Sequence, residues 1–171
     1  MIAPALVTEL FAYNAWANRR LFTALGAVPA EDYKRDLKTS FGSLHGTVGH
    51  IVWAEELWLR RWQQAPPPAV AQGKALDSLA AALHRWEAIE ADRARFLVGL
   101  EAARLEDVIV VKASTGGEFR HTLRETLLHA VDHSSYHRGQ LVAMLRQVGQ
   151  TPPATGLAGY YRAQRAQPSP V

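Results

Sequence analysis

The sequence predicts an all-α fold, an antiparallel four-helix bundle with crossover connections and a small β-ribbon before the last long helix. Apolar residues recur every three or four positions in four long segments, which is the period of an amphipathic helix. One β-branched segment interrupts this period, and prolines and glycines mark the ends of the helical segments. Helices of this kind bury their apolar faces against one another in a bundle.

The first predicted helix spans residues 5–25, and Gly26 follows its last apolar residue. A short turn is expected at residues 29–33. Ser43 carries a side chain suited to an N-cap, so the second helix is expected to begin there. It runs to about Gln63, because the three consecutive prolines that follow cannot continue a helix.

The third predicted helix spans residues 76–100, where the apolar stripe is continuous. The next segment breaks the helical period, because residues 108–111 are β-branched. Gly116 and Gly117 then form a hairpin turn signal. The sequence therefore predicts a small two-stranded ribbon between the third and fourth helices.

The fourth predicted helix opens with a capping box, in which Thr122 is followed three residues later by Glu125. Its apolar period continues to Gly149. Two prolines close this helix, and residues 154–164 are expected to form a short terminal helix.

Composition indicates one globular domain over residues 1–171, because 48% of the residues are apolar and only 20% are charged. The chain has no cysteine, which excludes disulfides, zinc ribbons and a protein thiol nucleophile. A metal in this protein would therefore be held by nitrogen and oxygen atoms.

Neither a membrane nor a nucleic acid is an expected partner. No segment has the roughly 18 uninterrupted apolar residues that a membrane span needs. The first residues lack the features of a signal peptide, so the cytoplasm is the expected compartment. The net charge is +3, but the basic residues are scattered among acidic ones and form no basic stripe.

A ladder of histidines lies in the fourth predicted helix, where His129, His133 and His137 follow one another at intervals of four residues. Residues four apart on an α-helix lie on the same face, so two imidazoles at this spacing can bind one ion. Two histidines leave a metal underliganded, and a further donor is expected from another helix of the bundle.

The second predicted helix offers three candidates for that further donor. The helical neighbours of His50 are small or apolar, as expected of a position that faces the core. His45 lies in the first turn of the helix, near solvent. Glu55 is the main competitor, since carboxylates also bind such metals, although its sequence context equally suits a charged helix surface. We favour His50.

Three segments of the chain, YNAWANRRLF, SFGSLHGTVGHIVWAEELWL and HAVDHSSYHRGQL, resemble the signatures of the DinB family. These bacterial four-helix-bundle proteins are also grouped with the YfiT-like metalloenzymes. The resemblance implies a bundle with crossover connections, a homodimer and a divalent metal such as zinc, nickel or iron. It also implies that three histidines hold the metal, and these match His50, His133 and His137. His129 fits a frequent family position that is not a usual ligand, and we interpret it as a buried histidine or one that supports a ligand.

Three neutral imidazoles leave a coordination position open, which is typical of catalytic sites. The resemblance implies metal-dependent transferases and isomerases that use low-molecular-weight thiols such as bacillithiol, mycothiol or glutathione. The leading hypothesis is a metal-dependent thiol S-transferase-like enzyme with a small electrophile as substrate and a thiol as cosubstrate. One alternative is a hydrolase that uses metal-bound hydroxide, with Glu55 or His129 as nominal base. Another is a non-enzymatic, stress-related metal-binding dimer.

The sequence also suggests roles for Gln140, Arg138, the tryptophans and the remaining histidines. Gln140 lies three residues after His137 on the same helix face, so it is either a pocket residue that steadies water or substrate, or a structural one. Arg138 lies off that face and is expected to pair with a carboxylate or a helix end. The five tryptophans are expected in the core or a dimer interface, and His84 and His121 on the surface.

Overall fold

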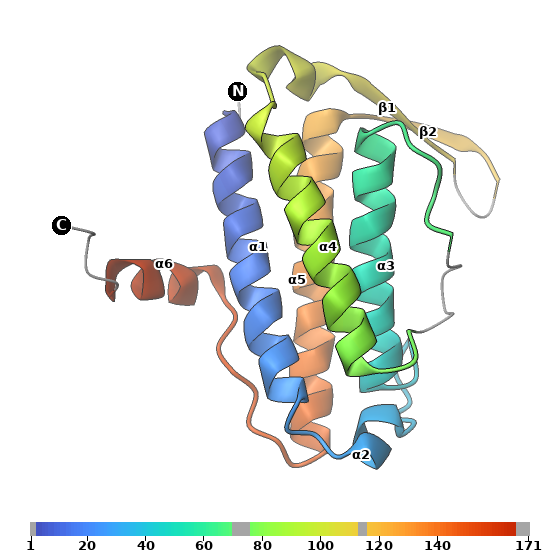
Figure 1. The fold of residues 1–171 in the computed structure, drawn as a ribbon, viewed down its shortest axis with the longest axis vertical. Helices are drawn as coiled ribbons and strands as arrows, with labels where there is room; N and C mark the ends of the chain where they lie inside the picture. The colour runs from blue at the N-terminus through green and yellow to red at the C-terminus, as the bar shows by residue number, and fades with distance from the viewer. Residues whose placement is uncertain (1–2, 70–75, 113–115, 167–171) are drawn as a thin grey trace.

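The computed structural model describes residues 3–69, 76–112 and 116–166. Four long helices form a bundle (Figure 1), which confirms the predicted fold class. The long helices are α1 (Pro4–Leu25), α3 (Leu44–Trp62), α4 (Leu79–Val98) and α5 (Leu123–Gln147). The shorter elements are α2 (Ala30–Lys34), the 3-10 helix η1 (Ala102–Glu106), the strands β1 (Val108–Lys112) and β2 (Glu118–Thr122), and α6 (Leu157–Ala166).

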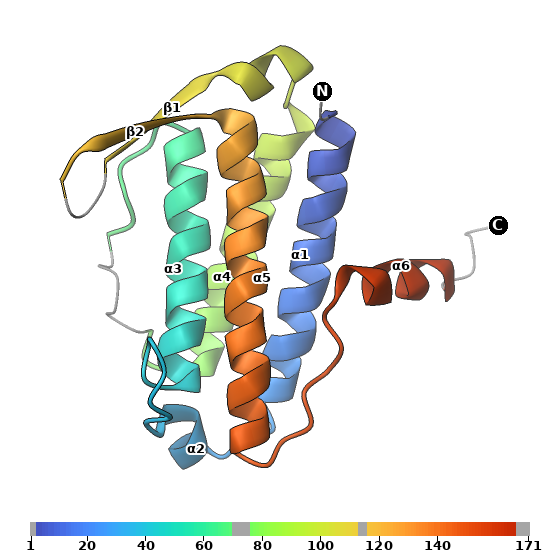
Figure 2. The ribbon, with the colours of Figure 1, turned by 180° about the vertical axis from the view of Figure 1, so that it is seen from behind.

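The four long helices do not simply alternate in direction. Helices α1 and α5 run one way along the bundle, and α3 and α4 run the other way (Figures 1 and 2). Helix α3 packs against both α5 and α4, while α1 packs against α5 and α4. The connection from α3 to α4 therefore joins opposite ends of the bundle, and this is the crossover that the sequence predicts.

Two predicted helix starts are confirmed in atomic detail. The Ser43 side chain accepts a hydrogen bond from the backbone N–H of Gly46 at 3.0 Å. At the start of α5, the Glu125 N–H donates to the Thr122 hydroxyl at 3.2 Å and the Thr122 N–H donates to the Glu125 carboxylate at 2.9 Å. Caps of this kind stabilise a helix by about 1 kcal/mol each, and they depend only on neighbouring residues.

Helix α4 begins later than the apolar period indicates, at Leu79 rather than Leu76. The reason is a local cap, because the Ser78 side chain accepts a hydrogen bond from the Ala81 N–H at 3.1 Å. Leu76 thus stays outside the helix, and its carbonyl lies 2.6 Å from Nε2 of His45.

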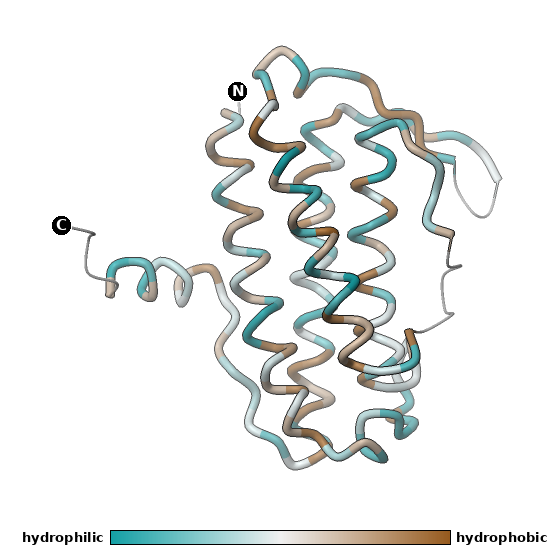
Figure 3. The backbone as a smooth tube through the Cα atoms, in the orientation of Figure 1, coloured by the Kyte–Doolittle hydropathy of each residue, from teal (hydrophilic) through white to brown (hydrophobic). Residues whose placement is uncertain are grey.

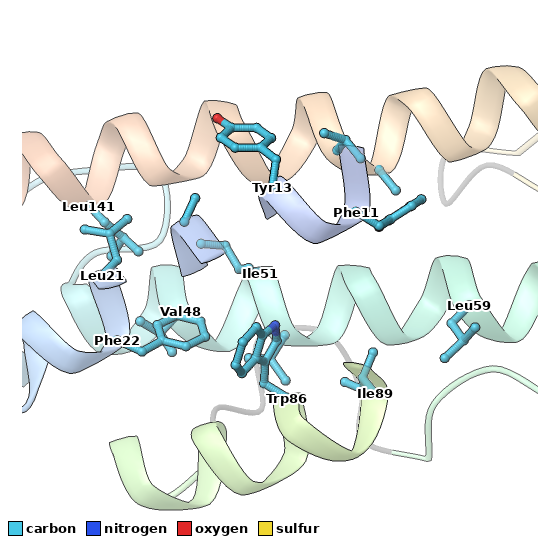
Figure 4. Close-up of a cluster of buried hydrophobic side chains, with 14 of the residues drawn as sticks. Phe11, Tyr13, Leu21, Phe22, Val48, Ile51, Leu59, Trp86, Ile89 and Leu141 are labelled. Carbon is cyan, nitrogen blue, oxygen red and sulfur yellow. The ribbon is translucent and has the colours of Figure 1, made fainter. Parts of the chain in front are cut away.

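Apolar side chains from all four long helices converge in the core (Figure 4), and Figure 3 shows hydrophobic residues recurring along each helix. Trp86 is fully buried and packs edge-on against Phe22, with ring centroids 5.3 Å apart. Trp62 packs in the same way against Phe11 at 5.8 Å. Within the described residues, no helix is both long and apolar enough to cross a membrane.

The ribbon is antiparallel, and its register pairs Ile109 with His121 and Val111 with Phe119. Residues directly opposite in such a pair project to the same face. Ile109 and Val111 are half-buried, whereas Val108 and its strand neighbours on the other face are exposed. The ribbon therefore turns the face with Val111 and Phe119 toward the helices.

Candidate metal centre

His50 of α3 meets His133 and His137 of α5 on the shared face of the two helices. Nε2 of His133 lies 3.0 Å from Nε2 of His50 and 3.1 Å from Nε2 of His137. Donor atoms of the three side chains all lie within 4.8 Å of one another. The structure thus gathers the three histidines that the family resemblance implies, and this group could hold a metal ion.

The donor set suits a borderline divalent ion. Zinc lies about 2.0–2.1 Å from imidazole nitrogens in a tetrahedral site, which places two such nitrogens roughly 3.3 Å apart. The two Nε2–Nε2 distances of 3.0 and 3.1 Å are only a few tenths of an ångström shorter. The nitrogen of His133 therefore lies at almost the separation from each of the other two that a shared ion requires.

The electrostatics keep His50 and His133 neutral at neutral pH, because the pKa of each is lowered. Burial lowers the pKa of His50 to about 4, and the nearby His137 and His133 add to this effect. Burial likewise lowers the pKa of His133 to about 4, with contributions from His137 and His129. A neutral imidazole offers the lone pair that a metal needs.

Gln140 orients one member of the group. Its Oε1 accepts a hydrogen bond from Nδ1 of His137 at 2.8 Å. This bond places the His137 proton on Nδ1 and leaves Nε2 free to act as a donor atom toward a metal. The sequence left open a pocket role, in which Gln140 steadies water or substrate, and a structural role; the bond to His137 is a structural contact.

Aromatic rings line the group of three histidines. Phe41 stacks on His50 with ring centroids 4.0 Å apart and also meets His137 edge-on at 5.4 Å. Trp53 lies beside His50 at 6.3 Å, and Tyr136 packs against His137 at 5.0 Å. These rings limit the access of water to the nitrogens from the sides that they cover.

Phe41 contacts two of the candidate ligands but was not predicted from the sequence, because it lies in a loop outside every periodic segment. The sequence feature that could have indicated this contact is Gly46, a glycine in the first turn of α3. A Cβ atom at Gly46 would lie 2.1 Å from the carbonyl oxygen of Phe41, so only glycine lets this loop approach α3 so closely.

The sequence of this chain matches a known protein family over almost its whole length. The DinB family model matches residues 1–169. The chain belongs to the DinB family. Protein DinB of Bacillus subtilis strain 168 is 30% identical over 155 residues, which cover 82% of this chain and 85% of that protein.

Solved structures show the same fold for this DinB-family protein. A DinB-like protein from Bacillus cereus ATCC 10987 matches with a TM-score of 0.67 at 16% identity, covering 86% of this chain and 94% of that chain. A conserved protein from Enterococcus faecalis matches with a TM-score of 0.68 at 17% identity, covering 86% and 98%. At these identities the likeness supports the fold alone.

Glu55 is excluded as a ligand of the metal centre in this DinB-family protein. Its side chain is 2% exposed and lies inside the bundle. Burial raises the pKa of its carboxyl, but the charge of Arg93 and hydrogen bonds from Ser134 and Asn14 outweigh burial and hold the pKa below its usual value. Its two oxygens accept from five donors, namely Asn14, Asn18, Ser134, Trp86 and Arg93.

Arg138 is structural, as expected, but its expected partner was wrong. The guanidinium is 1% exposed and donates to the side-chain oxygens of Asn14 and Asn18 and to the Tyr13 hydroxyl. These partners are amides and a phenol, rather than a carboxylate or a helix end. Because Arg138 directly follows His137, this anchor fixes the turn of α5 that carries a candidate ligand.

His129 takes no part in the group of three histidines. It is exposed rather than buried, which corrects one part of its interpretation. Its ring lies 5.8 Å from that of His133 and packs edge-on against Trp58 at 5.1 Å. The residue is exposed as a whole, but the withdrawal of part of its ring from solvent lowers its pKa.

The other histidines lie outside the centre of this DinB-family protein. His45 is half-buried rather than near solvent, because its Nε2 contacts the Leu76 carbonyl and its ring packs against Tyr33. His84 and His121 are exposed, which confirms the prediction for both.

Proposed function

We propose that this protein is a divalent-metal-dependent thiol S-transferase-like enzyme that joins a low-molecular-weight thiol to a small electrophile. The observation that carries the proposal is the open donor set of His50, His133 and His137. In the described part of the chain, no fourth histidine, cysteine or carboxylate belongs to the group. Structural sites close with four protein donors, whereas catalytic sites leave a position for a substrate.

The residues of the metal centre have three roles: they would hold the ion, orient a ligand, or shield the site from water. His50, His133 and His137 would hold the ion, and Gln140 keeps the donor nitrogen of His137 directed at it. Phe41 covers His50 and so limits entry of water from its side. A divalent ion bound there would stabilise the thiolate form of a thiol.

The transfer itself needs no nucleophile from the protein, which agrees with the absence of cysteine. The thiol loses its proton to solvent, its sulfur forms a bond to the electrophilic carbon, and the leaving group departs with its electron pair. The protein would position the two reactants and exclude part of the water from around them.

Hydrolysis would need a general base within hydrogen-bond reach of a water molecule. Five donors occupy the oxygens of Glu55, so this carboxylate cannot serve. His129 lies beside His133 and is the remaining candidate of the two that the sequence offered. Hydrolysis is thus left with one candidate base, and this supports thiol transfer as the leading proposal.

Metal analysis of the purified protein comes first, followed by a screen of bacillithiol, mycothiol and glutathione against a chromogenic electrophile. Turnover that depends on the thiol and disappears in His137→Ala, but persists in the control His84→Ala, supports the proposal. Turnover without thiol overturns it in favour of a hydrolase. Tight metal binding with neither activity overturns it in favour of a stress-related metal-binding protein.

We also propose that the protein is a cytoplasmic homodimer. The DinB family resemblance supports the dimer. Light scattering coupled to gel filtration tests the dimer, with a mass of 18.9 kDa as the result that would contradict it.

A further inference from the structure

A cavity of about 350 Å³ lies where the ribbon meets the helices. Its walls include Trp58 of α3, Val111 of β1 and Phe119 of β2, and the first turns of α5 complete it. Sites for small molecules have volumes of about 300–1,000 Å³ and mostly apolar walls with a few polar groups. This cavity has both properties, and it has no part in the metal centre.

Two neighbouring side chains hold Trp58, one of the aromatic walls, in place. The Arg61 guanidinium lies 4.6 Å from the ring centroid of Trp58, and His129 packs edge-on against the same indole at 5.1 Å. The ribbon register places Phe119 opposite Val111 on the face that turns toward the helices. Phe119 is nevertheless 55% exposed, so apolar ring surface remains available to a ligand.

The polar groups of the cavity do not favour a charged ligand. The Glu125 carboxylate accepts from the Thr122 backbone N–H at 2.9 Å and lies 3.6 Å from the His121 ring. The capping box and its histidine neighbour thus engage the one carboxylate that lines the cavity. No arginine or lysine lines it among the described residues. An uncharged, flat, apolar group fits these walls best.

The cavity lies near the metal centre, along the same two helices. Along α5, Glu125, His129 and His133 succeed one another at intervals of four residues, about 6 Å each. Along α3, Trp58 follows His50 by eight residues, so both lie close to one face of that helix. The His129 ring contacts both Trp58 and His133. A ring in the cavity would therefore lie one to two helical turns from the histidine group.

We propose that this cavity binds the uncharged aromatic part of the electrophile, so that aromatic electrophiles are the substrate class. The statement about substrates rests on the proposed thiol transfer, whereas the binding of an aromatic ring does not. With phenacyl chloride as an example, the thiol sulfur forms a bond to the CH₂ carbon and chloride leaves with the electron pair of the C–Cl bond. The thiol proton passes to solvent.

Binding is tested on the purified metal-loaded protein with acetophenone, an uncharged ring that cannot react. Nuclear magnetic resonance titration should shift the Trp58 indole N–H and the ribbon amides. Phe119→Ala should weaken this binding about five-fold, since it removes one aromatic wall. The matched control is Val110→Ala, because Val110 is 43% exposed and lies on the opposite face of the same ribbon. Equal binding in both variants, or shifts elsewhere only, overturns the proposal.

Kinetics separate this proposal from the proposed function. Phenacyl chloride and chloroacetone share one reactive group but differ by a phenyl ring. The ratio of their kcat/KM values should fall about five-fold in Phe119→Ala and stay constant in Val110→Ala. Thiol transfer with a ratio that Phe119→Ala leaves unchanged overturns the cavity and leaves the reaction standing. Ring binding that depends on Phe119 without any thiol transfer overturns the reaction and leaves the cavity standing.

Discussion

The buried carboxylate of Glu55 and the buried guanidinium of Arg138 are bridged by the same two side chains. Asn14 and Asn18 each accept a hydrogen bond from Arg138 and donate one to Glu55. Helix α1 thereby joins α3 to α5 behind the candidate metal centre. Ser134, which directly follows His133, also donates to Glu55. The network thus holds the two helices that carry the candidate ligands in one register.

Glu55→Gln should lower the free energy of unfolding by about 2 kcal/mol or more, because it removes the fully buried charge opposite the Arg93 guanidinium, which keeps only its ion pair with Glu90. Urea denaturation measures this change. The control is Glu87→Gln, since the ion pair of Glu87 with Arg19 is solvent-exposed and its loss should cost less than about 1 kcal/mol. Equal effects of the two substitutions would contradict the role given to the network.

His133→Ala and His137→Ala should each remove most of the bound metal while circular dichroism shows unchanged helix content. The bundle is held by its apolar core, so it does not need the ion to fold. His50→Ala should behave in the same way. His45→Ala and His84→Ala should keep the metal, as measured by elemental analysis. Full occupancy in any of the first three variants would remove that residue from the ligand set.

Gln140→Leu should weaken metal binding about 10- to 100-fold, because the His137 ring loses the hydrogen bond that orients it. Competition with a chelator gives the affinity. Gln147→Leu serves as the control, since Gln147 is exposed and lies at the end of the same helix. An unchanged affinity in Gln140→Leu would show that His137 is oriented by other contacts.

The metal-free protein should lose stability as the pH falls from about 6.5 to about 4. In the folded protein the pKa values of His50 and His133 are lowered to about 4. The unfolded chain binds these protons at higher pH, so protonation favours unfolding throughout this window. Urea denaturation at several pH values measures the slope, and a double variant with alanine at both positions should flatten it. A slope equal to that of the double variant would contradict the lowered pKa values.

Adding the correct thiol to nickel- or cobalt-substituted protein should produce a sulfur-to-metal charge-transfer absorption. The chain has no cysteine, so the added thiol is the only source of sulfur for thiolate coordination. The band should be absent in His137→Ala. If bacillithiol, mycothiol, glutathione and coenzyme A all fail to produce it in fully metallated protein, thiol transfer is the wrong reaction.

The sequence alone determined the features that depend on near neighbours. The caps at Ser43 and Thr122 act over three residues, so the starts of α3 and α5 were predictable. The spacing of His133 and His137 was equally local, because one helical turn separates them. The apolar environment of His50 indicated its inward position, and the family resemblance joined it to the other two.

Only the tertiary structure decided which distant groups meet. His50 and His133 are 83 positions apart in the chain, and Glu55 and Arg93 are 38 apart. The sequence context of Glu55 suited a surface or a metal site equally, but the packing of α1, α4 and α5 around it surrounded it with donors. Phe41 and the cavity under the ribbon likewise arise where segments from different helices and strands come together. Helical period reports which face of a segment is buried, whereas the partners of that face are set by how the whole chain packs.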